Sequence, residues 1–295
     1  MSIRVIPNNP EFKGLVEMLG DIEFAAPDGH ALKLHIIRPW KRTTRGYPLV
    51  VFIQGSSWTT PDQYWEIPQL SQLAARGFVV ATVTHRSCFE AKAPAFLTDV
   101  KAAIRFLKVK ASEYDIDPDR VCAWGTSSGG NAALLVGMTG DDPAFESADW
   151  PGVSSRVQAV VDCFGPTDLM RMMEVQYADQ LDEDGALFYA LGGGESADAC
   201  RAAMTRISPI AYAQPGRDFP PFLMLHGDAD PVVLYEDTER LYRRLVELGY
   251  AADLVRVSGA EHEGSFWSET VLEIIFAFIE EKIGGARNTE GFEND

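Results

Sequence analysis

The sequence is poor in histidine, cysteine and positive charge. Its 295 residues include only five histidines and four cysteines. Lysine and arginine together number 26 against 43 acidic residues, which gives a formal net charge of −17. A phosphate surface would repel so acidic a protein, and this argues against a nucleic acid or an anionic membrane as partner. We therefore expect a soluble protein that acts on a small molecule.

Long hydrophobic runs are also missing. No segment reaches the roughly 18 apolar residues that a membrane-spanning helix needs. The first nine residues, Met1 to Asn9, contain no apolar stretch of the length of a signal peptide. We therefore predict a cytoplasmic protein without a membrane partner, and the sequence gives no indication of the oligomeric state.

The cysteines are widely spaced and form no CxxC pair. They are Cys88, Cys122, Cys163 and Cys200. Two of them lie in apolar runs typical of strands, so we expect buried thiols rather than disulfides or a metal site. We expect no cofactor.

What the chain does have is 46% apolar residues, enough for a substantial core. Short apolar runs alternate with longer segments of helical periodicity, as expected for strands that are buried on both faces. These runs span residues 48–53, 78–83, 120–124, 157–163, 221–225 and 252–257. A turn signal at Pro27-Asp28-Gly29 predicts an antiparallel hairpin before them, over residues 21–38. The fold class is therefore α/β, with a mostly parallel sheet and helices on both faces.

One stretch breaks the alternation of strand and helix. Residues 167–208 exceed a simple crossover, so we predict a small cap inserted over the carboxyl edge of the sheet. Its methionines at 170, 172 and 173 suit core packing, and they equally suit the lining of an acyl or aromatic pocket. We expect one domain over residues 1–283, with this cap, and a disordered tail over 284–295.

A candidate nucleophile lies in a G-x-S-x-G pattern at residues 125–129. An apolar run precedes the pattern and a helix-like run follows it. A serine in a sharp turn from strand to helix is lifted clear of the backbone, and the flanking glycines avoid a Cβ clash. Ser127 is therefore our candidate, although the bare pattern is a weak signal by itself.

A serine nucleophile needs a base, and on such a sheet the order Ser, then Asp or Glu, then His is expected. Only His226 and His262 lie downstream of Ser127. His226 precedes the nearest acidic candidates, so His262 is the predicted base. It lies in a loop bracketed by Gly259 and Gly264, between a strand and the last helix.

The third member of such a triad orients the imidazole and stabilises its positive charge. Asp228 and Asp230 share the turn after the run at 221–225. We prefer Asp230, and we expect Asp228 to brace the turn by accepting from backbone amides. Glu236 and Asp237 are expected to begin the next helix.

Attack on a carbonyl also requires donors for the developing oxyanion. The amide of Ser128 follows the nucleophile at a predicted helix start. The amides of Ser56 and Ser57 are the other candidates, in the turn after the run at 48–53, unless this turn is an ordinary connection. Trp58 closes the turn and is our candidate substrate contact.

Several of these segments together resemble one known group. They are residues 125–130, 54–58, 226–233 and 259–264. Three further motifs also match: Asp117-Pro118-Asp119-Arg120, Phe164-Gly165-Pro166-Thr167-Asp168-Leu169 and Ser208-Pro209. The chain is similar, over about residues 20–283, to α/β-hydrolase serine esterases of the feruloyl/acetyl-xylan esterase-like group, which have an HGGG-type oxyanion loop. The resemblance implies an eight-stranded core, a Ser127/Asp230/His262 triad and hydrolysis of carboxylic esters without metal or cofactor. The implied substrates are small-molecule esters with short or aromatic acyl groups, including those on plant-wall sugars.

The loop at Gln54-Gly55-Ser56-Ser57 departs from the His-Gly-Gly-Gly pattern of that group. Because serine is disfavoured at positive φ, either the loop adopts ordinary dihedrals or the hydroxyls face the ligand.

Two other functions remain open. A prolyl-oligopeptidase-like peptidase or amidase uses the same triad, although it usually carries a large amino-terminal propeller for which this chain has no room. An inactive hydrolase fold that serves as a small-molecule receptor is the third possibility.

Overall fold

Eight strands form one mixed sheet in the computed structural model, which describes residues 2–177, 186–193 and 196–284. The strands are β1 (Val16–Ala25), β2 (Leu32–Pro39), β3 (Tyr47–Ile53), β4 (Val79–Val83), β5 (Ile116–Thr126), β6 (Ala159–Cys163), β7 (Phe222–Gly227) and β8 (Ala252–Val257). Their order is β1-β2-β4-β3-β5-β6-β7-β8. The predicted apolar runs match β3 to β8 closely, and the predicted hairpin is β1 with β2.

The pairing of the strands changes once across the sheet. β1 with β2 and β2 with β4 are antiparallel, and every other neighbouring pair is parallel. The parallel strands therefore all end at the same edge. This confirms the predicted α/β class with a mostly parallel sheet, and it brings the loops after β3, β5, β7 and β8 together.

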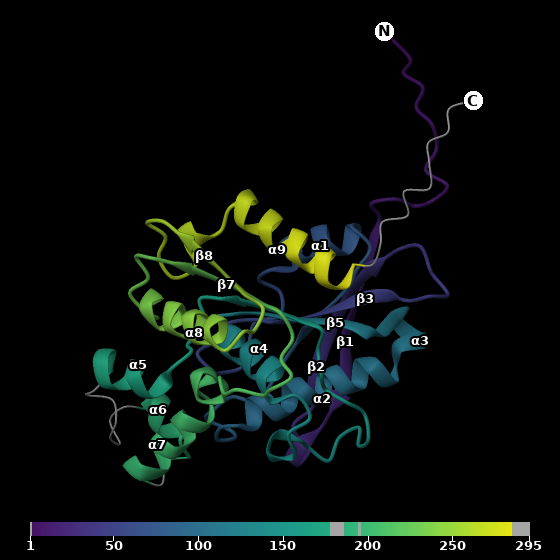
Figure 1. The fold of residues 1–295 in the computed structure, drawn as a ribbon. Helices are drawn as coiled ribbons and strands as arrows, with labels where there is room; N and C mark the ends of the chain where they lie inside the picture. Colours follow the sequence, from purple (N-terminus) through teal and green to yellow (C-terminus); the bar gives the residue numbers. More distant parts are fainter. Residues whose placement is uncertain (1, 178–185, 194–195, 285–295) are drawn as a thin grey trace.

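Helices cover both faces of the sheet (Figure 1). The α-helices are α1 (Ile67–Ala75), α2 (Ala95–Val109), α3 (Ala111–Tyr114), α4 (Ser128–Thr139), α5 (Leu169–Gln176), α6 (Ala186–Leu191), α7 (Ala197–Arg206), α8 (Tyr235–Glu247) and α9 (Glu269–Ile283). Short 3₁₀ turns are η1 (Pro27–Gly29), η2 (Pro143–Phe145), η4 (Pro209–Tyr212) and η5 (Gly264–Phe266). α1 and α9 lie on one face, and α2, α4 and α8 lie on the other.

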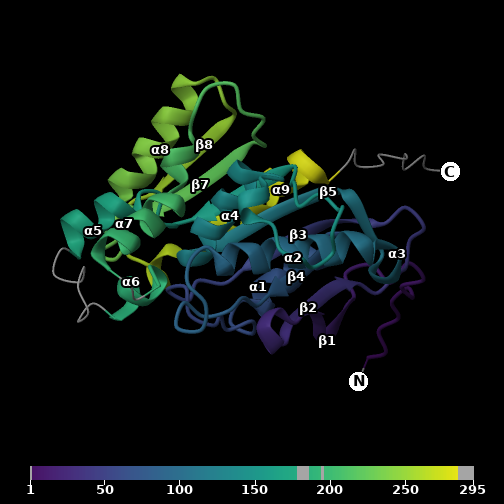
Figure 2. The ribbon, with the colours of Figure 1, turned by 90° about the horizontal axis from the view of Figure 1, so that it is seen from below.

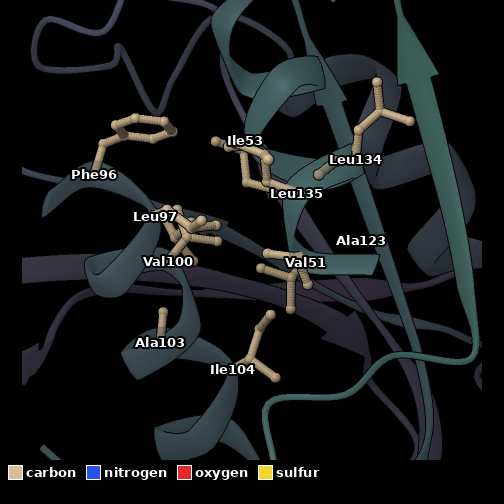
Figure 3. Packing of buried hydrophobic residues seen from close by; sticks show 14 of the residues in the cluster. Val51, Ile53, Phe96, Leu97, Val100, Ala103, Ile104, Ala123, Leu134 and Leu135 are labelled. Atoms are coloured by element: carbon tan, nitrogen blue, oxygen red, sulfur yellow. The ribbon is translucent and has the colours of Figure 1, made fainter. Parts of the chain in front are cut away.

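The core divides into two layers because successive strand residues point to opposite faces. On β3, Val51 and Ile53 face α2 and α4, whereas Val50 and Phe52 face α1 and α9. Figure 3 shows the first layer, in which Leu97 and Val100 of α2 and Leu134 and Leu135 of α4 surround the strand residues. These positions repeat at helical spacing, so one stripe of each helix is buried.

In the described part of the chain, α5, α6 and α7 lie between β6 and β7, where the sequence predicts a cap. α5, α6 and α7 cluster at the end of the molecule away from α3 (Figures 1 and 2). The acidic run from Asp179 to Asp184 lies outside the described residues, and so does the predicted tail after Gly284. All four cysteines are buried. None of the helices in the described ranges is long and apolar enough to cross a membrane.

Candidate active site

The candidate residues meet at the carboxyl edge of the sheet. Ser127 follows β5, Asp230 follows β7 and His262 follows β8. The parallel pairing of β5, β6, β7 and β8 places these three connections side by side although 135 positions separate the first residue from the last. Ligand sites of open α/β sheets characteristically lie at this edge.

Ser127 occupies a strained turn between β5 and α4. Its φ of 51° and ψ of −123° lie in a region that side chains rarely adopt. A β-carbon at Gly125 would lie 2.0 Å from the carbonyl oxygen of Gly129, and one at Gly129 would lie 2.0 Å from that of Ile53. The two glycines therefore permit this turn, and the amide of Ser127 donates to the carbonyl of Cys163 at 2.9 Å.

A hydrogen-bond chain joins the three predicted residues. The Oγ atom of Ser127 lies 3.0 Å from Nε2 of His262, and Nδ1 of His262 lies 2.7 Å from Oδ2 of Asp230. Because the carboxylate only accepts, Nδ1 carries the proton and Nε2 is left to accept from the serine hydroxyl. This is the tautomer that a general base beside a serine requires.

An aromatic side chain fixes the plane of the His262 ring. Phe164, which follows β6 and is fully buried, meets that ring edge-on with 4.8 Å between centroids and an interplanar angle of 64°. Phe164 in turn contacts Phe266, which belongs to the loop beyond the histidine. The ring is thus held between the core and its own loop.

Asp228 has a wider role than the one expected. Its Oδ2 accepts from Nε of Arg256 at 2.7 Å, and its Oδ1 accepts from the amide of Gly259. Asp228 does accept from backbone amides, as predicted, but one of these amides is that of Gly259 in the neighbouring loop. It holds the loop that carries His262, because β7 and β8 are neighbours and their loops leave the sheet together.

The loop after β3 requires a correction at Ser56. The amide of Ser56 donates to Oγ of Ser128 at 2.9 Å, so this predicted oxyanion donor is already engaged. The alternative of ordinary dihedrals is also wrong, since Ser57 and Trp58 have φ values of 52° and 57°. Of the three predicted donors, the amides of Ser57 and Ser128 remain. Ser128 lies in the first turn of α4, where amides have no intrahelical acceptor.

A buried asparagine that the sequence analysis did not single out ties the site together. Oδ1 of Asn131 accepts from Nε1 of Trp58 at 3.3 Å, and its Nδ2 donates to the carbonyls of Pro166 and Ile207 at 2.8 and 2.9 Å. Asn131 lies one helical turn after Ser127 on α4. It therefore connects the loop after β3 to both ends of the segment that contains α5 to α7.

A small cavity of about 90 Å³ opens beside the serine. It is lined by Ser57, Trp58, Ser127, Pro166, Met172, Tyr177, Phe188, Val232 and Val233. Met172 belongs to α5 and Phe188 to α6, so the segment between β6 and β7 forms one wall. The lining is mostly apolar, which suits a hydrocarbon group rather than a charged one.

A buried carboxyl group interacts electrostatically with Glu263, the residue after His262. Glu66 immediately precedes α1, and neither of its carboxyl oxygens has a hydrogen-bond partner within the described part of the chain. Burial, together with the charges of Glu263 and Asp62, raises the pKa of Glu66 to about 8. The sequence does not indicate that Glu66 has a raised pKa, because Glu263, whose charge acts on it, is almost 200 positions away in the chain.

Comparison with known proteins gives matches over most of the chain. The BD-FAE family model matches residues 34–245. LipM of Mycobacterium tuberculosis, a probable carboxylic ester hydrolase, is 30% identical over 219 residues, which are 72% of this chain and 48% of LipM. The isoprenylcysteine alpha-carbonyl methylesterase of Arabidopsis thaliana is 24% identical over 74% of this chain and 51% of its own. The chain thus spans about half the length of these relatives.

Two solved esterase structures match over nearly their whole length. A truncated carbohydrate esterase from gut microbiota has a TM-score of 0.81 and 26% identity, over 91% of this chain and 96% of that chain. Esterase Est2 of Thermogutta terrifontis with bound propionate has a TM-score of 0.74 and 25% identity, over 96% of this chain and 98% of that chain.

Proposed function

Because this chain belongs to the BD-FAE family of the α/β-hydrolase fold, we propose that it is a serine esterase acting through an acyl-enzyme. The observation that carries the proposal is the hydrogen-bond chain from Ser127 through His262 to Asp230. A serine hydroxyl alone is a poor nucleophile at neutral pH, and an oriented imidazole is what activates it. The names of the relatives and structural neighbours described above, which are esterases or ester hydrolases, support the same reaction class.

In the first half of the reaction, Oγ of Ser127 attacks the ester carbonyl carbon while its proton passes to Nε2 of His262. The carbonyl oxygen takes up the electron pair, and the amides of Ser57 and Ser128 donate to it. Asp230 stabilises the imidazolium formed on His262. The tetrahedral intermediate then collapses, the alkoxide leaves with the proton from Nε2, and the acyl group stays on Ser127.

In the second half, water takes the place of the alcohol. Nε2 of His262 removes a proton from the water as its oxygen attacks the acyl carbon. Collapse of the second intermediate returns the proton to Oγ of Ser127 and releases the acid. The ester and one water are thereby converted to an alcohol and a carboxylic acid, and the triad returns to its starting state.

The cavity beside Ser127 favours a short acyl group. At about 90 Å³ it is smaller than the cavity of about 150 Å³ that accommodates benzene in another protein. We therefore expect acetyl to butyryl groups rather than aromatic ones. The Est2 structures with propionate and butyrate support this size class. We also propose that residues 167–208 act as a cap over the site, since Met172, Tyr177 and Phe188 line the cavity from there.

The alcohol part of the ester is proposed from a neighbour. The carbohydrate esterase from gut microbiota supports an acylated sugar as the natural substrate. A neutral sugar ester also suits a chain with a net charge of −17, which would repel anionic substrates.

The test is hydrolysis of p-nitrophenyl acetate by the wild type and by Ser127→Ala. Loss of such a nucleophile typically costs about 10⁶-fold in kcat. Residual activity of more than a few per cent of the wild type would overturn the mechanism. An aminoacyl p-nitroanilide assayed in parallel separates an esterase from the peptidase or amidase alternative, and we expect the ester to be cleaved far faster.

A further inference from the structure

A second histidine contacts the acid of the triad. His226, the penultimate residue of β7, is fully buried. Its Nε2 lies 3.1 Å from Oδ2 of Asp230 and 2.9 Å from the carbonyl oxygen of Val233. Its Nδ1 lies 2.7 Å from Oγ1 of Thr238 on α8. The mechanism above gives this histidine no part, although it touches the same carboxylate oxygen as His262.

The partners of His226 define its tautomer. The carbonyl of Val233 and the carboxylate of Asp230 only accept, so Nε2 carries the proton. The hydroxyl of Thr238 is able to donate to Nδ1, and the neutral Nε2–H tautomer then satisfies every partner. A neutral donor holds Asp230 without cancelling its charge, and that charge is what the imidazolium of His262 needs.

The two oxygens of Asp230 are held in different ways. Oδ1 accepts from the amides of Val232 and Val233 at 2.8 and 3.0 Å. Oδ2 accepts from His262 at 2.7 Å and from His226 at 3.1 Å. His262 lies in a loop, whereas His226 lies in a core strand. His226 is therefore the rigid partner of the oxygen that orients the base.

The electrostatics of Asp230 agree with this geometry. Burial raises the pKa of Asp230, but the hydrogen bonds from His226, His262 and the Val233 amide outweigh it and hold that pKa well below its usual range. The carboxylate therefore remains charged throughout the pH range in which an imidazole titrates.

We propose that His226 is a positioning residue, which holds Oδ2 of Asp230 where it accepts from His262 and so stabilises the imidazolium formed during acyl transfer. This inference rests on the proposed esterase function. It predicts that the loss of the donor at Nε2 lowers kcat and changes the pH dependence, while substrate binding is unaffected.

The test compares His226→Asn with His226→Gln. The amide nitrogen of glutamine extends to about the position of Nε2, whereas that of asparagine reaches only the position of Nδ1. Hydrogen-bond partners of metal-ligating residues are typically worth about 10- to 100-fold in activity, and we expect a loss of the same order in kcat for the asparagine variant. We expect KM to stay within about twofold and the glutamine variant to recover most of kcat. Rates are expressed per active site titrated with a p-nitrophenyl phosphonate, which removes any effect of unfolded protein.

The pH profile of kcat/KM distinguishes positioning from a structural role. A displaced Asp230 stabilises protonated His262 less, so the acid limb of the asparagine variant should move to lower pH. An unchanged acid limb, or equal losses of kcat per site in both variants, would overturn the proposal. If the asparagine variant does not fold, Thr238→Val, which removes the donor to Nδ1, should move the acid limb in the same direction, and an unmoved limb there also overturns it.

Ser127→Ala measured alongside separates this proposal from the one on which it rests. An inactive Ser127→Ala together with an unaltered His226→Asn refutes only the positioning role. Hydrolysis by Ser127→Ala refutes the esterase mechanism itself, whatever the His226 variants do.

Discussion

The amide of Ser56 donates to the side-chain oxygen of Ser128, 2.9 Å away, and so fastens the loop after β3 to the residue that follows the nucleophile. The hydroxyl of Ser128 supports the loop, while the amide of the same residue is a proposed oxyanion donor. The adjacent Ser57 is thereby kept in its left-handed conformation beside the cavity. The geometry of the proposed oxyanion site thus depends on the hydroxyl of Ser128 as well as on backbone amides.

We predict that Ser128→Ala lowers kcat on p-nitrophenyl acetate by about 10-fold or more. The loss should stay below the 100- to 1000-fold typical of deleting an oxyanion donor, because the backbone amides remain. The lost hydrogen bond should also cost about 1 kcal/mol of unfolding free energy. Ser56→Ala is the matched control, since it removes a hydroxyl that donates to the carbonyl of Thr59 but keeps the Ser56 amide and its contact with Ser128. Equal kcat values for Ser128→Ala and the wild type would contradict this role.

The acyl preference should respond to Phe188. Phe188→Ala enlarges the cavity on the α6 side, so kcat/KM for p-nitrophenyl octanoate relative to the acetate should rise by about 10-fold or more, since each methylene accommodated in a pocket is worth about 1 to 3 kcal/mol. Tyr189→Ala is the control, because Tyr189 lines a separate surface depression. A chain-length profile that is the same in Phe188→Ala and the wild type would show that this cavity does not receive the acyl group.

The buried carboxyl of Glu66 should make stability depend on pH. Its pKa rises from 4.5 to about 8 on folding, so between these values the folded protein keeps a proton that the unfolded chain has released. Stability therefore falls as the pH rises through this window. Glu66→Gln removes the effect, and its melting temperature relative to the wild type should increase from pH 5 to pH 8 by at least about 2 °C.

Exposed Glu281 provides the comparison for Glu66. Glu281→Gln should show a melting temperature that differs from the wild type by a constant amount between pH 5 and pH 8. A difference that is equally constant for Glu66→Gln would mean that Glu66 is ionised in the folded protein, and the interpretation of its burial would be wrong.

Much of the fold was predictable because its signals are local. The runs that form β3 to β8 are short, apolar and separated by helical periodicity, and this combination is characteristic of a parallel sheet. The turn at Pro27-Asp28-Gly29 likewise marks the hairpin of β1 and β2. The proposed nucleophile and base follow from a motif and from the small number of histidines.

What the sequence could not provide are contacts between distant segments. Three hydrogen bonds depend on how loops leave neighbouring strands. They join Ser56 to Ser128, Asp228 to Gly259 and His226 to Asp230. The sequence offers only a preference for Asp230 over Asp228, because two carboxylates in one turn look alike until the loop of His262 is placed. The cytoplasmic location stays a prediction, since nothing in the fold tests it.

The most direct test of the central claim is the site of covalent labelling by a p-nitrophenyl phosphonate, mapped by mass spectrometry of proteolytic peptides. The account predicts one adduct per chain, on Ser127, with esterase activity lost in proportion to labelling and no adduct in Ser127→Ala. Full inactivation with the adduct on another residue, or labelling and hydrolysis that persist in Ser127→Ala, would contradict it.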